Sequence, residues 1–486
     1  MCMSHWMQWS QWCAVLNVIL VFILLDRFCG QEISSVLMWR CLPACFCSTI
    51  SICFAVLKTC FNFVIHCPSK CIISLWTSCQ ILTGKRIVLL CATAILLILP
   101  ILLRDARHSA FHLFLNKTVL MESMKNANSQ RILQAEKYFS LLNTSGMYNQ
   151  HMSHSSIASE QLINVSLTII TVSRNRHEID KYEPKYLTQT VWKFHSLLEK
   201  WLLHSQRLHV HTSVCNVDSI VASYHEAHTL SKFVPVFSRF NNPHFSLVHT
   251  LEKEKQDYMF CLNKSLEVHT EANYVFLVED DALPTDDIFD VLWHVLLMHT
   301  EQSFVRGEFH SKPSDLAFVK FYHPERLLNF ISLQPERLPE LFSYAAVLST
   351  VLTVVYAVIC GFATTNDVVT VDICWRNLFL FSLILTLACG RTGISEWRRL
   401  ASPVFYSYTP APSCCTPAML FPRLAAQLTV MYLNNNTCTN NFGKDSVLDN
   451  MLRDLHLTAY LVQPNTFTHI GVYSSLRWRI VDPFMV

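Results

Sequence analysis

Glycine is scarce in this chain of 486 residues. It contains nine glycines, and no two of them are separated by a single residue. Walker A loops and dinucleotide-binding fingerprints need closely spaced glycines so that the backbone can approach a phosphate, and the sequence therefore excludes both. The patterns GxSxG and HExxH are absent as well, which excludes the commonest hydrolase and zincin signatures.

Charged residues are also scarce. They make up 15% of the chain, against about 25% in soluble domains, whereas hydrophobic residues make up 51%. This balance argues against a disordered chain and against a purely soluble protein. The formal net charge is only +2, so no global positive field predicts nucleic-acid binding.

Cysteine is unevenly distributed along the chain. Eleven of the twenty cysteines lie before residue 80, in a stretch that has two acidic residues and no sustained helical or strand period. These cysteines lack the second pair that zinc-finger spacing requires. We define residues 1–84 as an N-terminal extension to which the sequence assigns no function.

An apolar segment follows this extension. Residues 87–103 are 17 uncharged positions with basic residues on both sides. This length reaches the lower limit for crossing about 30 Å of hydrocarbon. We therefore expect residues 85–104 to form an uncleaved transmembrane anchor; the alternative is a buried core helix.

Two further apolar segments lie close together downstream. Leu341–Ala363 is a run of 23 uncharged residues, and Asn377–Gly390 is a shorter run of 14 that could instead be a core helix. The polar loop expected between them, which includes Asp372, is short, and short loops join antiparallel neighbouring helices. The sequence predicts a transmembrane hairpin at residues 341–390.

N-glycosylation sequons bear on the topology. Because a hairpin crosses the membrane twice, both of its flanks must lie on one side. Five N-x-S/T sequons follow the anchor, four before the hairpin and one after it: Asn116, Asn143, Asn164, Asn263 and Asn435. They predict that residues 105–340 and 391–486 are both lumenal and form one domain that the hairpin interrupts.

Strands and helices alternate in this domain. Apolar, β-branched runs that are typical of buried parallel strands are separated by segments with helical spacing. The predicted strands are Ser166–Ser173, His209–Val217, Tyr274–Val278 and Leu316–Phe321, and the predicted helices are Leu187–His204, Leu251–Leu266 and Asp286–His299. The alternation predicts an α/β fold with a mixed, mostly parallel sheet, in which ligands bind beyond the carboxyl ends of the strands.

Three acidic residues, Glu279, Asp280 and Asp281, follow one predicted strand directly. Placing three carboxylates together is unfavourable unless cations compensate them. Their hard oxygen atoms suit Mg²⁺ or Mn²⁺ bound together with a diphosphate. A solvated turn leading into the next helix is the alternative, and the strand context favours the metal–phosphate site.

Three peptides carry a family resemblance. The Glu-Asp-Asp triplet resembles the DxD-type motif of GT-A glycosyltransferases, which binds a metal and the nucleotide-sugar diphosphate. The peptide LVQPNTFTHIGVYSSL, Leu461–Leu476, resembles the closing segment of type IV N-glycan branching N-acetylglucosaminyltransferases. Together with CCTPAMLFP, Cys414–Pro422, the arrangement resembles the Golgi post-GPI-attachment N-acetylgalactosaminyltransferases over roughly residues 85–486. That family has an N-terminal anchor and a GT-A domain split by a transmembrane hairpin.

The resemblance implies a function. The family transfers GalNAc from UDP-GalNAc to a mannose of the GPI glycan, and an α-linked donor that gives a β-linked product implies inversion. It further implies Mn²⁺ or Mg²⁺ as cofactor, GPI-anchored proteins or the GPI glycolipid as acceptor at the bilayer, and a multi-pass Golgi membrane protein with a lumenal catalytic domain.

The resemblance also implies roles for individual residues. The implied donor-binding residues are Val172, Ser173, Arg174, Asp218, Glu279, Asp280 and Asp281, and the implied metal ligands are Asp281, Glu279 and His469. Asp281 is the first choice for direct contact with the metal. For His469 the alternative is a packed loop histidine, and Asp218 could instead cap a turn.

The general base is sought in the peptide that begins at Lys444. An apparent amphipathic helix starts there, with Asp445 expected at its N-cap and Asp449 one turn later. Either carboxylate is a candidate base, and an exposed helix carboxylate is the alternative for each.

Two rival functions remain at this stage. One is a GlcNAc branching transferase that acts on N-glycans; the predicted hairpin argues against it, because those enzymes need only one anchor. The other is a non-enzymatic GPI-protein membrane factor with a degenerate transferase fold, and the retained acidic triplet argues against it.

Overall fold

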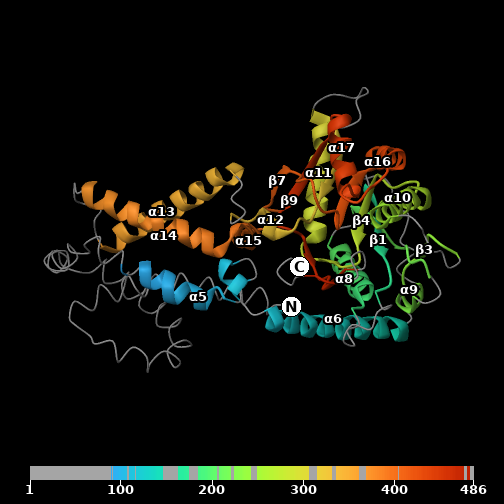
Figure 1. The fold of residues 1–486 in the computed structure, drawn as a ribbon, viewed down its shortest axis with the longest axis horizontal. Coiled ribbons are helices and arrows are strands. Elements are labelled where there is room, and N and C mark those ends of the chain that lie inside the picture. Colours follow the sequence, from blue (N-terminus) through green and yellow to red (C-terminus); the bar gives the residue numbers. More distant parts are fainter. Residues whose placement is uncertain are drawn as a thin grey trace. The chain divides into compact units, whose positions relative to one another are not determined.

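A computed structural model gives the fold (Figure 1). It describes residues 91–474, except 105, 107–108, 115–116, 146–162, 175–183, 205–206, 221–223, 242–248, 306–314, 331–334, 361–367 and 403, together with residues 89 and 479–481. The predicted extension, residues 1–84, and the sequon at Asn116 lie outside the described residues. The chain divides into two units, one made of Leu115–Asn329 with Thr392–Val486, and the other including Phe330–Arg391.

The first unit is built on a mixed sheet. Eight strands of the described chain pair in the order β3-β2-β1-β4-β8-β6-β9-β7. They are β1 (Ile163–Thr171), β2 (Leu208–Asn216), β3 (Val236–Ser238), β4 (Tyr274–Glu279), β6 (Leu316–Lys320), β7 (Ser407–Pro410), β8 (Ala418–Pro422) and β9 (Thr458–Gln463). Only β7 and β8 run against the others. The predicted mixed, mostly parallel α/β sheet is confirmed, and it fits a GT-A-like domain.

Short strand pairs and helices complete this unit. β5 (Ala282–Pro284) pairs with β10 (Phe467–His469), and β11 (Tyr473–Ser474) pairs with β12 (Arg479–Ile480). The helices are α6 (Lys117–Ser145), α8 (Tyr186–Leu202), α9 (His225–Leu230), α10 (Thr250–Val268), α11 (Ile288–Val305), α12 (Glu325–Leu328), α15 (Arg391–Ala401), α16 (Arg423–Asn435) and α17 (Lys444–Asp454). The predicted strands and helices of this unit are therefore present, with ends shifted by a few residues.

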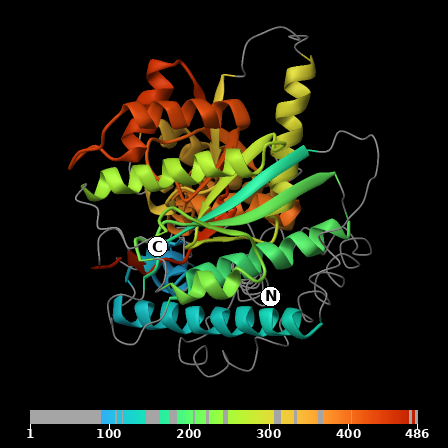
Figure 2. The same cartoon turned by 90° about the vertical axis from the view of Figure 1, so that its right-hand side faces the viewer.

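Helices cover both faces of the sheet, as Figure 2 shows for α8 and α10. Successive residues of β4 supply the two cores, because side chains alternate along a strand. Phe276 and Val278 pack with α8 and α11, whereas Val275 and Leu277 pack with α10, α16 and α17. Both faces are apolar, so the strand reads as a continuous hydrophobic run.

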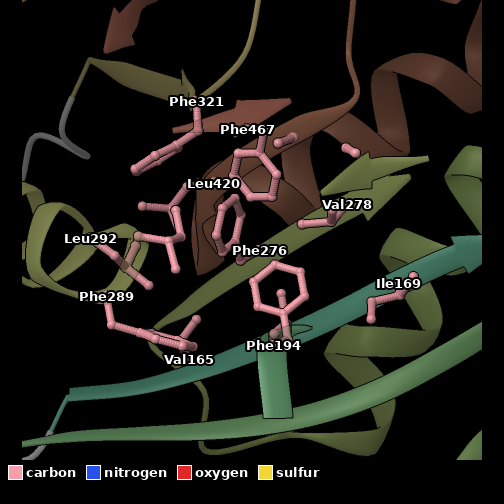
Figure 3. Close-up of a cluster of buried hydrophobic side chains, with 14 of the residues drawn as sticks. Val165, Ile169, Phe194, Phe276, Val278, Phe289, Leu292, Phe321, Leu420 and Phe467 are labelled. Atoms are coloured by element: carbon pink, nitrogen blue, oxygen red, sulfur yellow. The ribbon is translucent and has the colours of Figure 1, made fainter. Parts of the chain in front are cut away.

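Aromatic rings dominate the core on the α8 side. Figure 3 shows Phe194, Phe276 and Phe467 packed together, and the ring of Phe467 lies 6.0 Å from that of Phe194 and 5.9 Å from that of Phe276. Phe467 belongs to the C-terminal peptide, so burial of this ring fixes that peptide beside the ends of β1 and β4. On the opposite face a disulfide joins Cys215 of β2 to Cys261 of α10.

The second unit contains two long antiparallel helices. α13 spans Leu338–Cys360 and α14 spans Val368–Cys389, and they pack along one another. Arg391 Nε lies 2.7 Å from Glu340 Oε2, and Ser349 Oγ donates a hydrogen bond to the Trp375 carbonyl. Two antiparallel helices therefore lie where the sequence predicted a transmembrane hairpin.

Membrane-spanning length is met by one helix of the described residues. Leu338–Val355 of α13 is long and apolar enough to cross a bilayer, whereas Cys91–Leu102, Ile288–Met298 and Trp375–Cys389 are apolar but shorter. The segment predicted as the N-terminal anchor contains a π-helical stretch, Ala94–Ile98, followed by α5 (Leu99–Leu102). The anchor and the transmembrane character of the hairpin stay predictions.

Two predictions about helix ends are wrong. Gly443, and not Asp445, is the N-cap of α17, and Asp445 lies in the first turn with its carboxylate bound elsewhere. The helix predicted from Asn377 begins at Val368, so Asp372 lies within α14 and not in a loop. An acidic residue in the first turns is compatible with a helix, because the positive end of the helix dipole stabilises it.

The described sequons differ in accessibility. Asn143, Asn263 and Asn435 are exposed. Asn164 lies within β1, and its Oδ1 is buried without a hydrogen-bond partner. Of these four, Asn164 is the poorest acceptor for a glycan in the folded protein.

Candidate active site

The candidate site lies at the carboxyl edge of the large sheet. Thr171 ends β1, Glu279 ends β4 and Lys320 ends β6, and these three strands run in the same direction. β8 runs the opposite way, so Cys415 and Thr416, which precede it, reach the same edge. Residues far apart in the sequence meet here because parallel strands end at one edge.

Arg174 is the cation that pairs with Asp280 and Asp281 of the acidic triplet. Its Nη1 lies 2.6 Å from Asp280 Oδ1, and its Nη2 lies 3.1 Å from Asp281 Oδ2. The three side chains are at most 10% exposed. The guanidinium also stacks over the ring of Tyr186, 4.8 Å from its centroid. The sequence assigned Arg174 to the nucleotide, and in the structure it clamps two carboxylates.

Both side-chain oxygens of Asp280 have partners. Oδ1 pairs with Arg174, and Oδ2 accepts a hydrogen bond of 2.7 Å from Thr171 Oγ1. The Asp280 carbonyl accepts another from Thr190 Oγ1. Burial raises the pKa of Asp280 to about 6, although the charge of Arg174 acts in the opposite direction. These contacts give Asp280 a positioning role, because both of its side-chain oxygens are held by protein groups.

Asp281 has an oxygen to spare. Its Oδ2 faces Arg174 and lies 3.5 Å from His469 Nε2, whereas its Oδ1 is buried without a hydrogen-bond partner. Burial alone would raise the pKa of Asp281, but His469 and Arg174 outweigh it and hold this pKa well below its usual range. Asp281 is therefore a buried, ionised carboxylate.

The C-terminal peptide approaches Asp281 closely. The amide of Ile470 donates a hydrogen bond of 2.8 Å to the Asp281 carbonyl. A Cβ atom placed on Gly471 would lie 2.4 Å from Asp281 Oδ2 and 2.9 Å from His469 Cε1. Only glycine leaves room here for the carboxylate and the imidazole.

Glu279 forms a separate charge cluster. Lys444 Nζ lies 3.2 Å from Glu279 Oε1 and 2.9 Å from Glu254 Oε1, and it sits over the ring of Tyr258. Burial alone would lower the pKa of Lys444, but the two carboxylates raise it well above its usual value. Glu279 is 31% exposed, so its carboxylate is accessible from the carboxyl edge while Lys444 is not.

The two candidate bases lie on one face of α17. Asp445 Oδ2 accepts a hydrogen bond of 2.8 Å from the Cys415 amide, and its Oδ1 lies 3.5 Å from Thr416 Oγ1. The same Thr416 Oγ1 lies 3.5 Å from Glu279 Oε1, which places Asp445 beside the acidic triplet. Asp449 is partly exposed and pairs with Arg453 at 3.4 Å.

A pair of adjacent cysteines borders Asp445. The Sγ atoms of Cys414 and Cys415 lie 2.8 Å apart, and His323 Nε2 lies 4.0 Å from Cys414 Sγ. The Cys415 thiol lowers the pKa of Cys414 to about 5, with help from His323 and Lys320 against the effect of burial. Lys320 Nζ donates hydrogen bonds to the carbonyls of Pro412 and Cys414 and so fixes this loop.

The remaining predicted donor residues lie at the ends of β1 and β2. The Ser173 amide donates a hydrogen bond of 2.9 Å to Asp218 Oδ2, and the Ile220 amide donates one of 2.6 Å to Asp218 Oδ1. Asp218 is fully buried, so in the structure it ties two loops together. Val172 packs against the apolar core on the α10 side.

The donor set fits a divalent metal. The free oxygen of Asp281 is a buried polar atom without a partner, and His469 lies beside it. Carboxylate oxygen and imidazole nitrogen are both common ligands of divalent metals. Glu279 reaches the same edge but has Lys444 as its partner. Of the predicted ligands, Asp281 and His469 are thus brought together.

Several site residues were not recognised from the sequence. Lys444, Thr416 and Lys320 had no assigned role, and their contacts span 92 to 165 residues of sequence. Gly471 lies within the C-terminal peptide Leu461–Leu476. Because the chain has only nine glycines, a glycine at this position could have indicated the site. A rare glycine between site residues indicates a close approach.

Comparison with protein families gives a match over this domain. The family model described as GPI-N-acetylgalactosamine transferase PGAP4 matches residues 165–468, which is more than half of the chain. The match includes the acidic triplet and both candidate bases, and it ends one residue before His469.

Proposed function

Because this chain belongs to the GPI-N-acetylgalactosamine transferase PGAP4 family, we propose that it transfers GalNAc from UDP-GalNAc to a mannose of the GPI glycan, with inversion and with Mn²⁺ or Mg²⁺. A glycosyltransferase with a role in GPI GalNAc transfer is what the family match establishes. The observation that carries the finer proposal is Asp281, a buried and ionised carboxylate with one free oxygen beside His469.

Asp281 and His469 would hold the metal, and the bound metal would stabilise the charge on the departing diphosphate. Arg174 holds Asp281 in place, because one guanidinium spans Asp280 and Asp281. Such a clamp fixes the rotamer of the ligand before the donor arrives. Gly471 lets the C-terminal peptide close over this carboxylate.

Asp445 is our candidate for the general base. Inversion needs one carboxylate that removes the proton from the attacking mannose hydroxyl. The Cys415 amide orients Oδ2 of Asp445, which leaves Oδ1 with its single contact to Thr416 at 3.5 Å. In this proposal Oδ1 accepts the hydroxyl proton. Asp449 is the weaker candidate, since its carboxylate is shared with Arg453.

Membrane attachment suits a GPI acceptor. We propose that α13 and α14 form a transmembrane hairpin in the Golgi membrane, that residues 85–104 add an N-terminal anchor, and that the catalytic domain is lumenal. The apolar side chains that α13 leaves exposed support contact with lipid: Phe342, Val347, Val351, Val354 and Val355. Enzyme and glycolipid would then share one surface, which raises their effective concentration.

The test is sugar transfer by the full-length protein in membranes. A mannose-bearing GPI glycan is incubated with labelled UDP-GalNAc or UDP-GlcNAc, with and without Mn²⁺, using wild type and Asp281→Ala. Glu267→Ala is the control, since this exposed carboxylate lies on α10, away from the carboxyl edge. We expect Mn²⁺-dependent transfer from UDP-GalNAc that Asp281→Ala abolishes and Glu267→Ala retains.

Other results would assign another function. Transfer from UDP-GlcNAc would favour a branching transferase. No transfer from either donor by folded protein that also fails to bind UDP with Mn²⁺ would favour a non-enzymatic membrane factor.

A further inference from the structure

A cluster of imidazoles lies on β2, away from the carboxyl edge. His209 and His211 lie two residues apart on this strand, and His269 and Glu271 lie in the connection between α10 and β4. We name His211, His269 and Glu271 the imidazole–carboxylate cluster. In the sheet register His211 is opposite Ser166, five residues before Thr171 at the end of β1. Five residues of strand correspond to about 16 Å, so this cluster is separate from the candidate active site.

The three side chains converge on one point. The rings of His211 and His269 are stacked at 4.8 Å, and His211 Nε2 lies 3.3 Å from Glu271 Oε1. One nitrogen or oxygen atom from each of the three residues lies within 4.8 Å of the other two. Donor atoms this close can be brought onto one metal ion by small side-chain rotations.

Two nitrogen atoms of these residues are buried without a hydrogen-bond partner. Neither His211 Nε2 nor His269 Nε2 has a hydrogen-bond partner, although both are shielded from solvent. Buried polar atoms are almost always satisfied, so an unsatisfied facing pair calls for an explanation. A cation that accepts two nitrogen lone pairs would satisfy both atoms.

The side chain of Arg423 holds the backbone around His269 and Glu271 in place. Arg423 Nη1 donates hydrogen bonds to the carbonyls of His269 and Ala272, and its Nη2 donates one to the Leu266 carbonyl. Residues 266–272 are thereby fixed against the start of α16. A ligand set on clamped backbone loses little conformational entropy when it binds.

We propose that His211, His269 and Glu271 bind one Zn²⁺ ion. Two imidazole nitrogens and one carboxylate oxygen are typical zinc ligands, whereas Mg²⁺ and Ca²⁺ prefer all-oxygen sites. With three protein ligands, water completes the tetrahedron. The ion fastens the α10–β4 connection to β2. The Cys215–Cys261 disulfide joins α10 to β2 at another position. The site serves stability and takes no part in sugar transfer.

The experiment measures Zn²⁺ binding to the full-length, detergent-solubilised protein after removal of metals with EDTA. Asp281→Ala is present in every sample, so that the candidate active-site metal does not contribute. Zn²⁺ alone is titrated by calorimetry, and thermal unfolding is followed with and without it. His211→Gln/His269→Gln and Glu271→Gln test the ligands, and His204→Gln, an exposed histidine at the end of α8, is the matched control.

We expect one Zn²⁺ fewer per chain in the double histidine variant, or an affinity lower by at least about 100-fold, since losing even an outer-shell partner costs about 10- to 100-fold. Glu271→Gln weakens binding about 10-fold or more. Because the Glu271 side chain is 51% exposed, this substitution is not expected to disturb the fold. His204→Gln binds as the parent does. Zn²⁺ raises the unfolding temperature of the parent and not of the double variant. Equal stoichiometry and affinity in parent and ligand variants would overturn the proposal.

Discussion

Gly471 stands so close to Asp281 that a Cβ atom on it would lie 2.4 Å from Asp281 Oδ2. The C-terminal peptide therefore reaches the acidic triplet with its backbone as well as with the His469 side chain. Its own hydrogen bond, from the Ile470 amide to the Asp281 carbonyl, holds the approach. The shape of the candidate metal site consequently depends on a residue that has no side chain.

Gly471→Ala is expected to reduce the rate of GalNAc transfer by about 10- to 100-fold, because a displacement of about 1 Å at a reacting centre can cost that much. The added methyl displaces the Asp281 carboxylate or His469. Initial rates over a range of Mn²⁺ concentrations measure the effect. The apparent affinity for Mn²⁺ should also be lower than in wild type. Gly443→Ala is the control, because its Cβ would meet only Leu251 at 3.8 Å. Equal rates for the two variants would contradict the steric argument.

Arg174→Ala is expected to destabilise the fold as well as to abolish activity. It leaves Asp280 and Asp281 buried without their cation, and breaking a buried pair costs about 3–5 kcal/mol. Denaturant unfolding gives this free energy. Lys264→Ala, which removes an exposed pair with Glu267, should cost less than about 1 kcal/mol.

Arg174→Lys separates charge from geometry. It keeps a cation but loses the fork that spans two carboxylates, so we expect stability between those of Arg174→Ala and wild type, with activity still low. Wild-type activity in Arg174→Lys would show that the fork is unimportant.

The two carboxylates of α17 should respond differently to amide substitution. Asp445→Asn is expected to lower kcat by about 100- to 10,000-fold, the range for a lost general base, with little change in KM. Asp449→Asn should lower it less than about 10-fold. The opposite ranking would move the base to Asp449.

Cys414 should react as a thiolate near neutral pH. Its pKa is lowered to about 5, so the thiolate fraction is nearly constant above pH 6 and falls only as the pH drops through 5. An ordinary thiol with a pKa of about 8.5 instead gains nearly tenfold per pH unit between 6 and 8. Iodoacetamide labelling rates, read by mass spectrometry, distinguish them, with Cys414→Ser as the control. Labelling that rises steadily to pH 9, or that requires prior reduction, would contradict a free thiolate.

Replacing residues 341–390 by a short soluble linker should impair transfer to membrane GPI more than hydrolysis of UDP-GalNAc. Hydrolysis needs the catalytic edge alone, whereas transfer also needs both partners on one surface. An unrelated transmembrane hairpin of equal length is the control and should restore transfer. Equal losses in both assays would favour a folding role for α13 and α14.

The local elements could be predicted because they depend on nearby residues. The apolar run Tyr274–Val278 forms β4, because a strand buried on both sheet faces is apolar throughout. The helical spacing after Tyr186 forms α8, because a helix buried on one face has apolar residues at helical intervals. The acidic triplet was recognisable for the same reason, because it follows its strand directly. The helix end at Asp445 was misjudged, because its carboxylate prefers the Cys415 amide, a partner 30 residues away.

The sequence by itself determined the alternation of strands and helices and the place of the acidic triplet, both of which follow from contacts within one element. Only the tertiary structure decided which cation each carboxylate receives. Arg174 reaches Asp280 and Asp281 across more than 100 residues, and Lys444 reaches Glu279 across 165. These pairings depend on the strand order of the sheet, which brings distant strand ends to one edge. A buried charge needs a partner of opposite charge, and the residues next to it in the sequence do not indicate which distant residue that partner is.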